Sequence, residues 1–284
     1  NIVLLSILRF IIFSFIKNHM ASASAVKKIR KKKVFPTDDE VAEAMAEYTF
    51  NLSKKFCEER DYFTVVISGG DLTFWLRKLL DAKYDDKIEW SKWHIFWVDE
   101  RVVPLDDEDS NYKQALDRFL SDPKVSIPTG NIYTIDKDCA ALGDAKGAAI
   151  LYEECIKNLV NQNIIRTYKS SGFPQFDLQL LGMGPDGHMA SLFPGRFQIN
   201  EKASLVTYIT NSTTKPPPKR ITFTLPVINC ASYNLMAVCG EAQADAVAKV
   251  FKNDFNLPAA RLTADTEAIW YLDQTAASEL PIGL

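Results

Sequence analysis

The sequence has 284 residues, of which 47% are hydrophobic and 24% charged, and its formal net charge is −3. This composition is typical of a globular protein and excludes disorder over most of the chain. The small negative charge excludes a general attraction to nucleic acid, so any bound anion must be held by a local cluster of basic groups.

The cysteines and histidines give no sign of a metal site. Five cysteines lie far apart, without the paired spacing of a zinc site or a disulfide framework, and we interpret them as reduced thiols. There are three histidines and no HExxH pattern. We therefore expect no metal and no cofactor, and neither nucleic acid nor a membrane as a partner.

The first residues need their own interpretation. Residues 2–16 form an apolar run, interrupted by Arg9, that is too short to span a membrane comfortably. Met20 has the character of a translation start, while a signal anchor and, from the basic run at 27–33, a transit peptide are alternatives. We expect residues 1–33 to be a leader or solvated tail, and the protein to be cytosolic or, alternatively, plastidic.

From residue 37 onward the sequence predicts alternating helices and strands. A capping box followed by apolar residues at helical spacing predicts a helix over residues 37–56. The apolar, β-branched run at 63–67 predicts a buried strand. A further helix is expected to begin at Asp71 and to reach Leu80.

The alternation continues to the end of the chain. Further strands are predicted at residues 94–98, 131–135, 177–181, 205–209, 221–225, 234–239 and 268–272. Further helices are predicted from Ser110 to Phe119, from about residue 144 to 160 and from 241 to 251. We expect residues 34–284 to form a single catalytic α/β domain, with a Rossmann-like, mostly parallel sheet and helices on both faces.

Ligands of such sheets bind beyond the carboxyl ends of the strands, which directs attention to three loops. The first holds Ser68, Gly69 and Gly70. Its glycines let the backbone approach a ligand, and its amides lie at a helix N-terminus, where phosphate is favoured. For this loop alone, an ordinary strand-to-helix turn is the commoner explanation.

The second loop holds Asp99, Glu100 and Arg101, directly after a predicted strand. Charge runs are most often solvated clusters. A guanidinium group is also suited to bidentate phosphate binding, and the place of Arg101 at a strand end favours that role.

The third loop, residues 182–195, is the most specific. Gly182, Gly184 and Gly187 give a formal GxGxxG pattern, which raises the question of a dinucleotide site. We reject that site, because the loop leaves almost no room for a following helix and no acidic residue ends a strand about 20 residues later.

His188 stands out among these glycines. An imidazole at the carboxyl end of a strand can accept a proton from water near neutral pH. Asp186 is either a carboxylate that orients this imidazole or a turn-forming residue, and both interpretations stay open. His94, which begins a strand, is interpreted as structural.

A fourth basic element is Lys219-Arg220, which follows the proline tract at 216–218. We interpret the tract as a rigid positioning loop. A charged, exposed strand edge is the alternative explanation for Arg220.

Four segments together resemble the 6-phosphogluconolactonases, most closely the plant members of that family. They are VVISGG, WVDERVVP with a following SNY, LLGMGPDGHMASLFPG and KPPPKRITFTLPVIN. Glucosamine-6-phosphate deaminases and related isomerases share the architecture but resemble FNEPG after the histidine loop. This chain has SLFPG at 191–195, which favours the lactonase.

The resemblance implies hydrolysis of 6-phospho-D-glucono-1,5-lactone to 6-phosphogluconate in the oxidative pentose phosphate pathway, without metal or cofactor. We expect His188, supported by Asp186, to deprotonate the attacking water. The residues expected to contact the substrate are Ser68, Gly69, Gly70, Asp99, Arg101, Gly184, Gly187 and Arg220. The expected partner is a small sugar-phosphate lactone, and we expect a monomer.

Two positions depart from the family pattern. Asp71 stands where the family often has serine, and a carboxylate beside a phosphate is unfavourable unless it points away. Gln243 stands where the family often has a phosphate-binding lysine. These departures keep open a catalytically weak sugar-phosphate-binding paralogue, and an aminosugar-phosphate isomerase or deaminase, which shares the architecture, is the other alternative. A nucleophilic Ser191 is discounted, because no GxSxG pattern is present.

Overall fold

The computed structural model describes residues 30–211 and 217–280. Some residues that we interpreted from the sequence lie outside these ranges: Met20, the apolar run at 2–16, part of the basic run at 27–33, and Pro216 of the proline tract. In the described residues, no helix is long and apolar enough to cross a membrane.

A six-stranded sheet lies at the centre of the unit Lys31–Leu284. Its strands, in spatial order, are β1 (Lys31–Phe35), β11 (Glu267–Asp273), β10 (Tyr233–Val238), β7 (Leu178–Leu181), β2 (Phe63–Ile67) and β3 (Trp93–Trp97). Every neighbouring pair is parallel. The α/β fold with a mostly parallel sheet is therefore confirmed.

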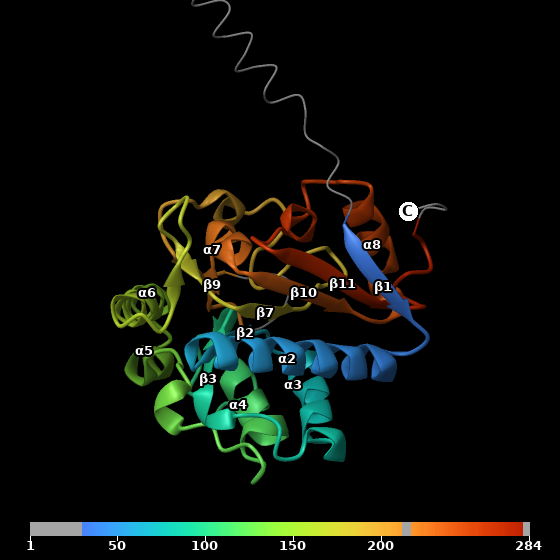
Figure 1. The fold of residues 1–284 in the computed structure, drawn as a ribbon. Helices are drawn as coiled ribbons and strands as arrows, with labels where there is room; N and C mark the ends of the chain where they lie inside the picture. Colours follow the sequence, from blue (N-terminus) through green and yellow to red (C-terminus); the bar gives the residue numbers. More distant parts are fainter. Residues whose placement is uncertain (1–29, 212–216, 281–284) are drawn as a thin grey trace, which may run out of the picture. The chain divides into compact units, whose positions relative to one another are not determined.

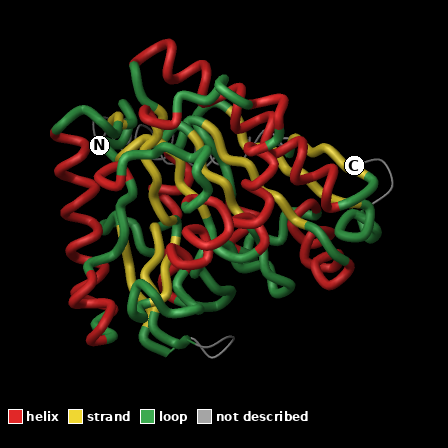
Figure 2. The backbone as a smooth tube through the Cα atoms, turned by 90° about the horizontal axis from the view of Figure 1, so that it is seen from below, coloured by secondary structure: helices red, strands yellow, loops and turns green. Residues whose placement is uncertain are grey.

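Helices cover both faces of this sheet. They are α2 (Asp38–Arg60), α3 (Asp71–Trp75), α4 (Asn111–Ala115), α5 (Lys137–Leu142), α6 (Ala145–Asn161), α7 (Leu225–Cys230) and α8 (Ala244–Phe251). On β11, Tyr271 meets Tyr48 of α2, whereas its neighbour Trp270 meets Phe251 of α8. Successive side chains of a strand point to opposite faces, so α2 and α8 lie on opposite sides, as Figure 1 shows. Figure 2 shows the strands between the helices.

Several helices begin and continue as the sequence indicates. Thr37 caps α2 by accepting a hydrogen bond from the Glu40 amide, and Ser110 caps α4 by accepting one from the Lys113 amide. Tighter or wider turns extend the short helices: Leu76–Leu80 is a 3₁₀ segment after α3, Leu116–Leu120 is a π segment after α4, and Glu241–Gln243 is a 3₁₀ turn before α8. Other 3₁₀ turns are Ala82–Tyr84, Trp90–Lys92, Thr129–Asn131, Phe197–Asn200 and Pro258–Arg261.

A second, antiparallel sheet contains two strands that the sequence predicts without indicating their pairing. Its order is β4 (Asp99–Arg101), β9 (Arg220–Phe223) and β8 (Val206–Ile209). Since β4 follows β3 after a single residue, the chain passes directly from the parallel sheet into this one. The register pairs Arg101 with Arg220. A two-stranded ribbon, β5 (Arg166–Thr167) and β6 (Pro174–Gln175), completes the strands of the described residues.

Three sequence predictions were wrong in detail. Residues 131–135 form no strand, because only Ile132 makes an isolated bridge, to Ile95, before the chain turns into α5. The strand predicted to reach residue 225 ends at Phe223, and α7 follows. Lys31–Phe35 forms β1, so the basic run is not wholly a solvated tail, and the folded unit begins ahead of the boundary predicted at residue 34.

The lysines of β1 fit an edge strand. Lys31 pairs with Glu267 at 2.6 Å, and Lys33 lies 5.6 Å from the ring centre of Tyr271. Charged side chains at a sheet edge oppose pairing with further chains. This explains why a strand here has the composition of a tail.

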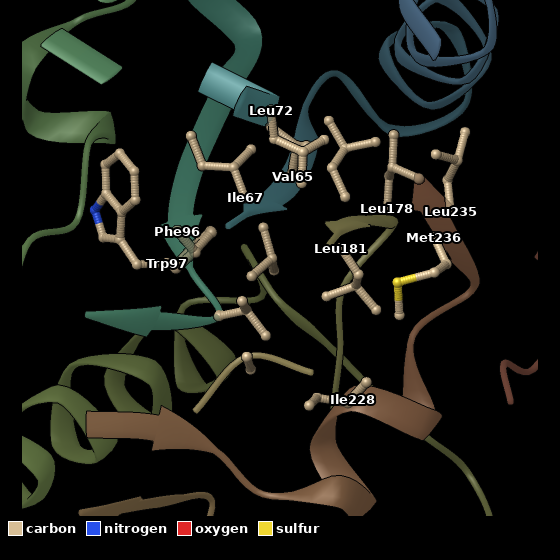
Figure 3. Close-up of a cluster of buried hydrophobic side chains, with 14 of the residues drawn as sticks. Val65, Ile67, Leu72, Phe96, Trp97, Leu178, Leu181, Ile228, Leu235 and Met236 are labelled. Carbon is tan, nitrogen blue, oxygen red and sulfur yellow. The ribbon is translucent and has the colours of Figure 1, made fainter. Parts of the chain in front are cut away.

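The central strands are buried along their whole length. Val65, Leu178 and Leu235 come from neighbouring strands and are fully buried, and Figure 3 shows them in one row. Close packing of this kind holds the strand ends in fixed positions. Since the strands are parallel, the residues after Ile67, Leu181 and Val238 meet at one edge of the sheet.

Candidate active site

A pocket of about 240 Å³ lies at this edge of the sheet. It is lined by eight of the ten predicted site residues: Ser68, Gly69, Gly70, Asp99, Arg101, Gly184, His188 and Arg220. Asp186 and Gly187 are not among the lining residues. The candidate base and the candidate phosphate-binding arginine thus share one cavity, although they are far apart in the sequence.

His188 is held by the carboxylate two residues before it. The Nδ1 atom of His188 lies 2.5 Å from Oδ1 of Asp186, which also accepts the His188 backbone amide at 3.2 Å. Burial is the largest single effect and acts to raise the pKa of Asp186, but the hydrogen bonds from His188 and the electrostatic attraction to it together outweigh burial and hold that pKa below its usual value. An ionised carboxylate only accepts, so Nδ1 carries the proton and Nε2 keeps its lone pair as a base.

Gly184 and Gly187 shape the histidine loop in different ways. A Cβ atom on Gly184 would lie 2.1 Å from Cε1 of His188, so the imidazole packs directly on this glycine. Gly187 has a φ of +79°, and its amide donates to the Gly184 carbonyl at 2.9 Å. Gly187 was expected to contact the substrate, whereas its place in the structure is a turn beneath the histidine.

Gly184→Ala tests how closely the imidazole is held. We expect kcat to fall about 10²-fold or more, because the added methyl group displaces the base from its position. The measurement is the steady-state rate of lactone hydrolysis. Gly130→Ala is the matched control, since a Cβ atom there has open space. Equal kcat values for the two variants would contradict the packing described here.

Phe193 packs against both the candidate base and a buried cation. Its ring centre lies 4.7 Å from that of His188 and 5.7 Å from the guanidinium carbon of Arg220. The ring is almost fully buried. One aromatic side chain therefore contacts both groups.

Arg220 is a buried cation, so the alternative interpretation as part of a charged, exposed strand edge is wrong. It is 3% exposed, and burial lowers its pKa while Asp99 opposes that effect. Its Nη1 donates weakly to Oγ of Ser191 at 3.5 Å, and Ser191 in turn donates to Asp99 at 2.7 Å. Ser191 is fully buried in this network, which agrees with discounting it as a nucleophile.

Arg101 lies beside Arg220 because β4 and β9 pair these two residues. One nitrogen of Arg101, Nη1, donates to the Asp109 carbonyl at 2.6 Å. Another, Nε, is buried and has no hydrogen-bond partner among the described residues. Two adjacent guanidinium groups, one with an unused donor, favour a negatively charged ligand.

The first loop is packed against α4. A Cβ atom on Gly69 would lie 1.8 Å from Oδ1 of Asn111, so only glycine leaves room for that amide. The Gly70 amide donates to Gln114 at 3.2 Å and is therefore already used within the protein. The Ser68 hydroxyl is buried without a partner among the described residues, and Ser68 lines the pocket.

Sequence reasoning assigned no role to Asn111, Trp75 or Cys239, although all three line the pocket. Asn111 donates from Nδ2 to the Asp99 carbonyl at 2.8 Å, while its Oδ1 has no partner among the described residues. Its place directly after the Ser110 cap was the available signal, but that signal also fits an ordinary helix start.

Comparison with known proteins decides the family. The model described as "Glucosamine-6-phosphate isomerases/6-phosphogluconolactonase" matches residues 36–270. An Arabidopsis thaliana protein named "Probable 6-phosphogluconolactonase 4" is 77% identical over 263 residues, covering 92% of this chain and 100% of that protein. The chain belongs to this family. The resemblance inferred from the sequence motifs is thereby confirmed.

Two further members of the glucosamine-6-phosphate isomerase/6-phosphogluconolactonase family are similar in sequence or structure. "6-phosphogluconolactonase 3, chloroplastic" of Arabidopsis thaliana is 49% identical, covering 92% of this chain and 79% of that protein. A crystal structure of 6-phosphogluconolactonase from Thermotoga maritima is 28% identical with a TM-score of 0.67, covering 86% of this chain and 100% of that chain. The fold is thus that of the family.

The two departures from the family pattern both lie at the pocket. Asp71 is exposed, is the first residue of α3, and follows Gly70 at the N-cap position. Gln243 also lines the pocket, and its amide nitrogen is placed to donate to the carbonyls of Cys239 at 3.1 Å and Gly240 at 3.2 Å. Neither side chain adds positive charge to the pocket.

Gln243→Lys is expected to lower KM for the phosphorylated lactone by about tenfold, since a hydrogen bond from a charged donor contributes about 1.5–3 kcal/mol. The measurement compares the KM of Gln243→Lys with the KM of the control variant Gln162→Lys. Gln162 follows α6, is exposed, and does not line the pocket. An unchanged KM in Gln243→Lys would show that the phosphate does not reach this side of the pocket.

Proposed function

We propose that this chain hydrolyses 6-phospho-D-glucono-1,5-lactone to 6-phosphogluconate in the oxidative pentose phosphate pathway, with His188 as general base and Arg101 as the main phosphate ligand. The observation that carries the proposal is that His188 and Arg101 line the same pocket. The name of the relative with 77% identity supports the choice of substrate.

The chemistry needs only one group that accepts and returns a proton. Nε2 of His188 takes a proton from water as the water oxygen attacks the lactone carbonyl carbon. The carbonyl becomes an oxyanion, and the bond from this carbon to the ring oxygen then breaks. The imidazolium returns its proton to the ring oxygen, which leaves as a hydroxyl group. Asp186 stabilises the imidazolium through Nδ1.

The phosphate group supplies the binding energy that positions the ester. Arg101 lines the pocket and its buried Nε has no hydrogen-bond partner among the described residues, and Arg220 adds a second positive charge beside it. The buried hydroxyl of Ser68 offers one more donor. An anchored phosphate makes attack at the carbonyl effectively intramolecular, which lowers the entropic part of the barrier.

The direct test uses freshly generated lactone. The purified protein should accelerate loss of 6-phosphogluconolactone above its spontaneous hydrolysis, and a rate equal to the spontaneous one would reject the proposal. Since the family description includes isomerases, ammonia release from glucosamine-6-phosphate is the matched second assay. Ammonia release without lactone hydrolysis would favour the deaminase instead.

A third outcome would identify a catalytically weak paralogue. Such a protein would show thermal stabilisation by 6-phosphogluconate without turnover of the lactone. Restoration of turnover by Gln243→Lys would then attribute the weakness to the missing cation.

The remaining expectations concern the setting of the reaction. We expect a monomeric protein that acts on a small sugar phosphate in the cytosol. The plastid is the alternative, and the chloroplastic name of a 49% identical relative supports it. A fluorescent fusion of the full chain, compared with one that begins at Met20, tests the location.

A further inference from the structure

We propose that Glu100 is a positioning residue that holds Arg101 and Asn111 in the arrangement that binds the substrate phosphate. The inference rests on the proposed function. Glu100 is 1% exposed and is not among the residues that line the pocket, so it acts through its neighbours and not on the substrate.

The Glu100 carboxylate accepts four hydrogen bonds from two separate parts of the chain. Oε1 accepts the backbone amides of Arg101 and Asn111, both at 2.7 Å. Oε2 accepts the amide of Tyr112 at 2.8 Å and the hydroxyl of Ser110 at 3.2 Å. One side chain therefore ties the end of β4 to the first turn of α4.

These hydrogen bonds close the loop that separates Arg101 from Asn111, both of which line the pocket. Residues 102–109 connect Arg101 to the start of α4, and they lie outside the regular strands and helices. Arg101 donates from its side chain to the Asp109 carbonyl, and Asn111 donates to the Asp99 carbonyl. Both of these contacts need β4 and α4 to stay at a fixed separation, which the buried carboxylate maintains.

The four donors require a group that only accepts. An ionised carboxylate has enough lone pairs for all of them, and its negative charge suits the amides at a helix N-terminus. Glutamine has the same shape, but its NH₂ group would face two of these donors. A buried donor left without an acceptor costs about 1–3 kcal/mol.

The charge state of Glu100 is sensitive to pH near neutrality. Burial raises the pKa of Glu100 to about 7, although the backbone hydrogen bonds from Asn111, Tyr112 and Arg101 act in the opposite direction. As the pH falls below this value the carboxyl gains a proton, and one oxygen turns from acceptor into donor. The charged and titratable groups around it are Asp99, Arg101, Tyr112, Tyr152 and Arg220.

The test compares Glu100→Gln with the wild-type protein over a range of pH. At about pH 8 we expect KM for the lactone to rise about tenfold, with kcat much less affected. At about pH 6 the ratio of the two KM values should shrink toward one, because wild-type Glu100 is then neutral as well. Titration of the substrate phosphate affects both proteins and cancels in this ratio.

Asp106→Asn is the matched control, because it removes a carboxylate from the same loop at an exposed position. It should leave KM and its pH dependence unchanged. A KM ratio for Glu100→Gln that stays constant with pH, or a loss of kcat at unchanged KM, would overturn the positioning role. Glu100→Asp keeps the charge but shortens the reach, and if the glutamine variant does not fold, a KM for Glu100→Asp equal to that of the wild type at about pH 8 would overturn the positioning role.

Binding of 6-phosphogluconate, measured by calorimetry on the same proteins, separates this inference from the proposed reaction. If the wild-type protein binds this ligand without hydrolysing the lactone, the proposed reaction fails. The positioning role then stands when Glu100→Gln weakens binding about tenfold at about pH 8, and it fails when binding is equal.

Discussion

His188→Ala is expected to lower kcat for lactone hydrolysis by about 10²- to 10⁴-fold, which is the usual contribution of a positioned general base. KM should change little, because the phosphate ligands are intact. The effect follows from the free Nε2 that the hydrogen bond to Asp186 leaves as a base. The measurement is the enzymatic rate after subtraction of spontaneous lactone hydrolysis.

His94→Gln is the control for the loss of a histidine. His94 lies in β3, bonds to the hydroxyl of Tyr133 at 2.9 Å, and is not among the residues that line the pocket. Burial, followed by the positive charge of Arg60, lowers its pKa to about 4, so it is neutral at physiological pH and kcat should persist without it. If His188→Ala retained the wild-type kcat, a different group would have to activate the water.

Asp186→Asn separates the orienting carboxylate from the base itself. An asparagine side chain can hold the ring but cannot stabilise the imidazolium by charge, so kcat should fall less than in His188→Ala. A loss as large as that of His188→Ala would indicate that the ring no longer presents Nε2 to the pocket.

Arg101→Gln is expected to raise KM by about 10- to 100-fold, because a hydrogen bond to a charged group contributes about 1.5–3 kcal/mol. The phosphate would lose the ligand whose Nε has no partner among the described residues. We also expect a fall in kcat, because the anchored phosphate helps to position the carbonyl, but the change in KM should be the larger of the two. Competition by inorganic phosphate provides a second measurement.

Arg77→Gln is the matched control for this change. Arg77 is exposed in the 3₁₀ segment after α3 and is not a lining residue of the catalytic pocket. Its replacement removes the same charge from the same protein at a different place. Equal KM values for Arg101→Gln and Arg77→Gln would reject Arg101 as the phosphate ligand.

The strands that could be predicted are those whose own sequence carries the signal. Residues 63–67 form a continuous apolar run, and such runs are typical of parallel strands buried on both faces. The strand β1 was missed because its stability comes from pairing with β11 at the sheet edge, while its lysines have the composition of a solvated segment. The opposite error occurred at 131–135, where β-branched and aromatic residues make one bridge only.

The sequence indicates most of the residues of the candidate site but not the hydrogen bonds and packing contacts between them. The glycines and His188 follow a strand in an unusual local sequence, and the family motifs point to the same residues. The four hydrogen bonds of Glu100, and the ring of Phe193 between base and cation, depend on parts of the chain that meet only after folding. No local pattern contains that information, because the partners belong to different elements.

Phe193 has a consequence for how this enzyme can change over time. Since one ring touches both His188 and Arg220, a substitution at this position shifts the proton acceptor and the positive charge together. The effects of substitutions at residues in contact are not additive, so a substitution at Phe193 changes the effect of substitutions at His188 and Arg220. In the evolution of a new substrate specificity, a change at Phe193 would therefore alter the positions of the base and of the cation at the same time.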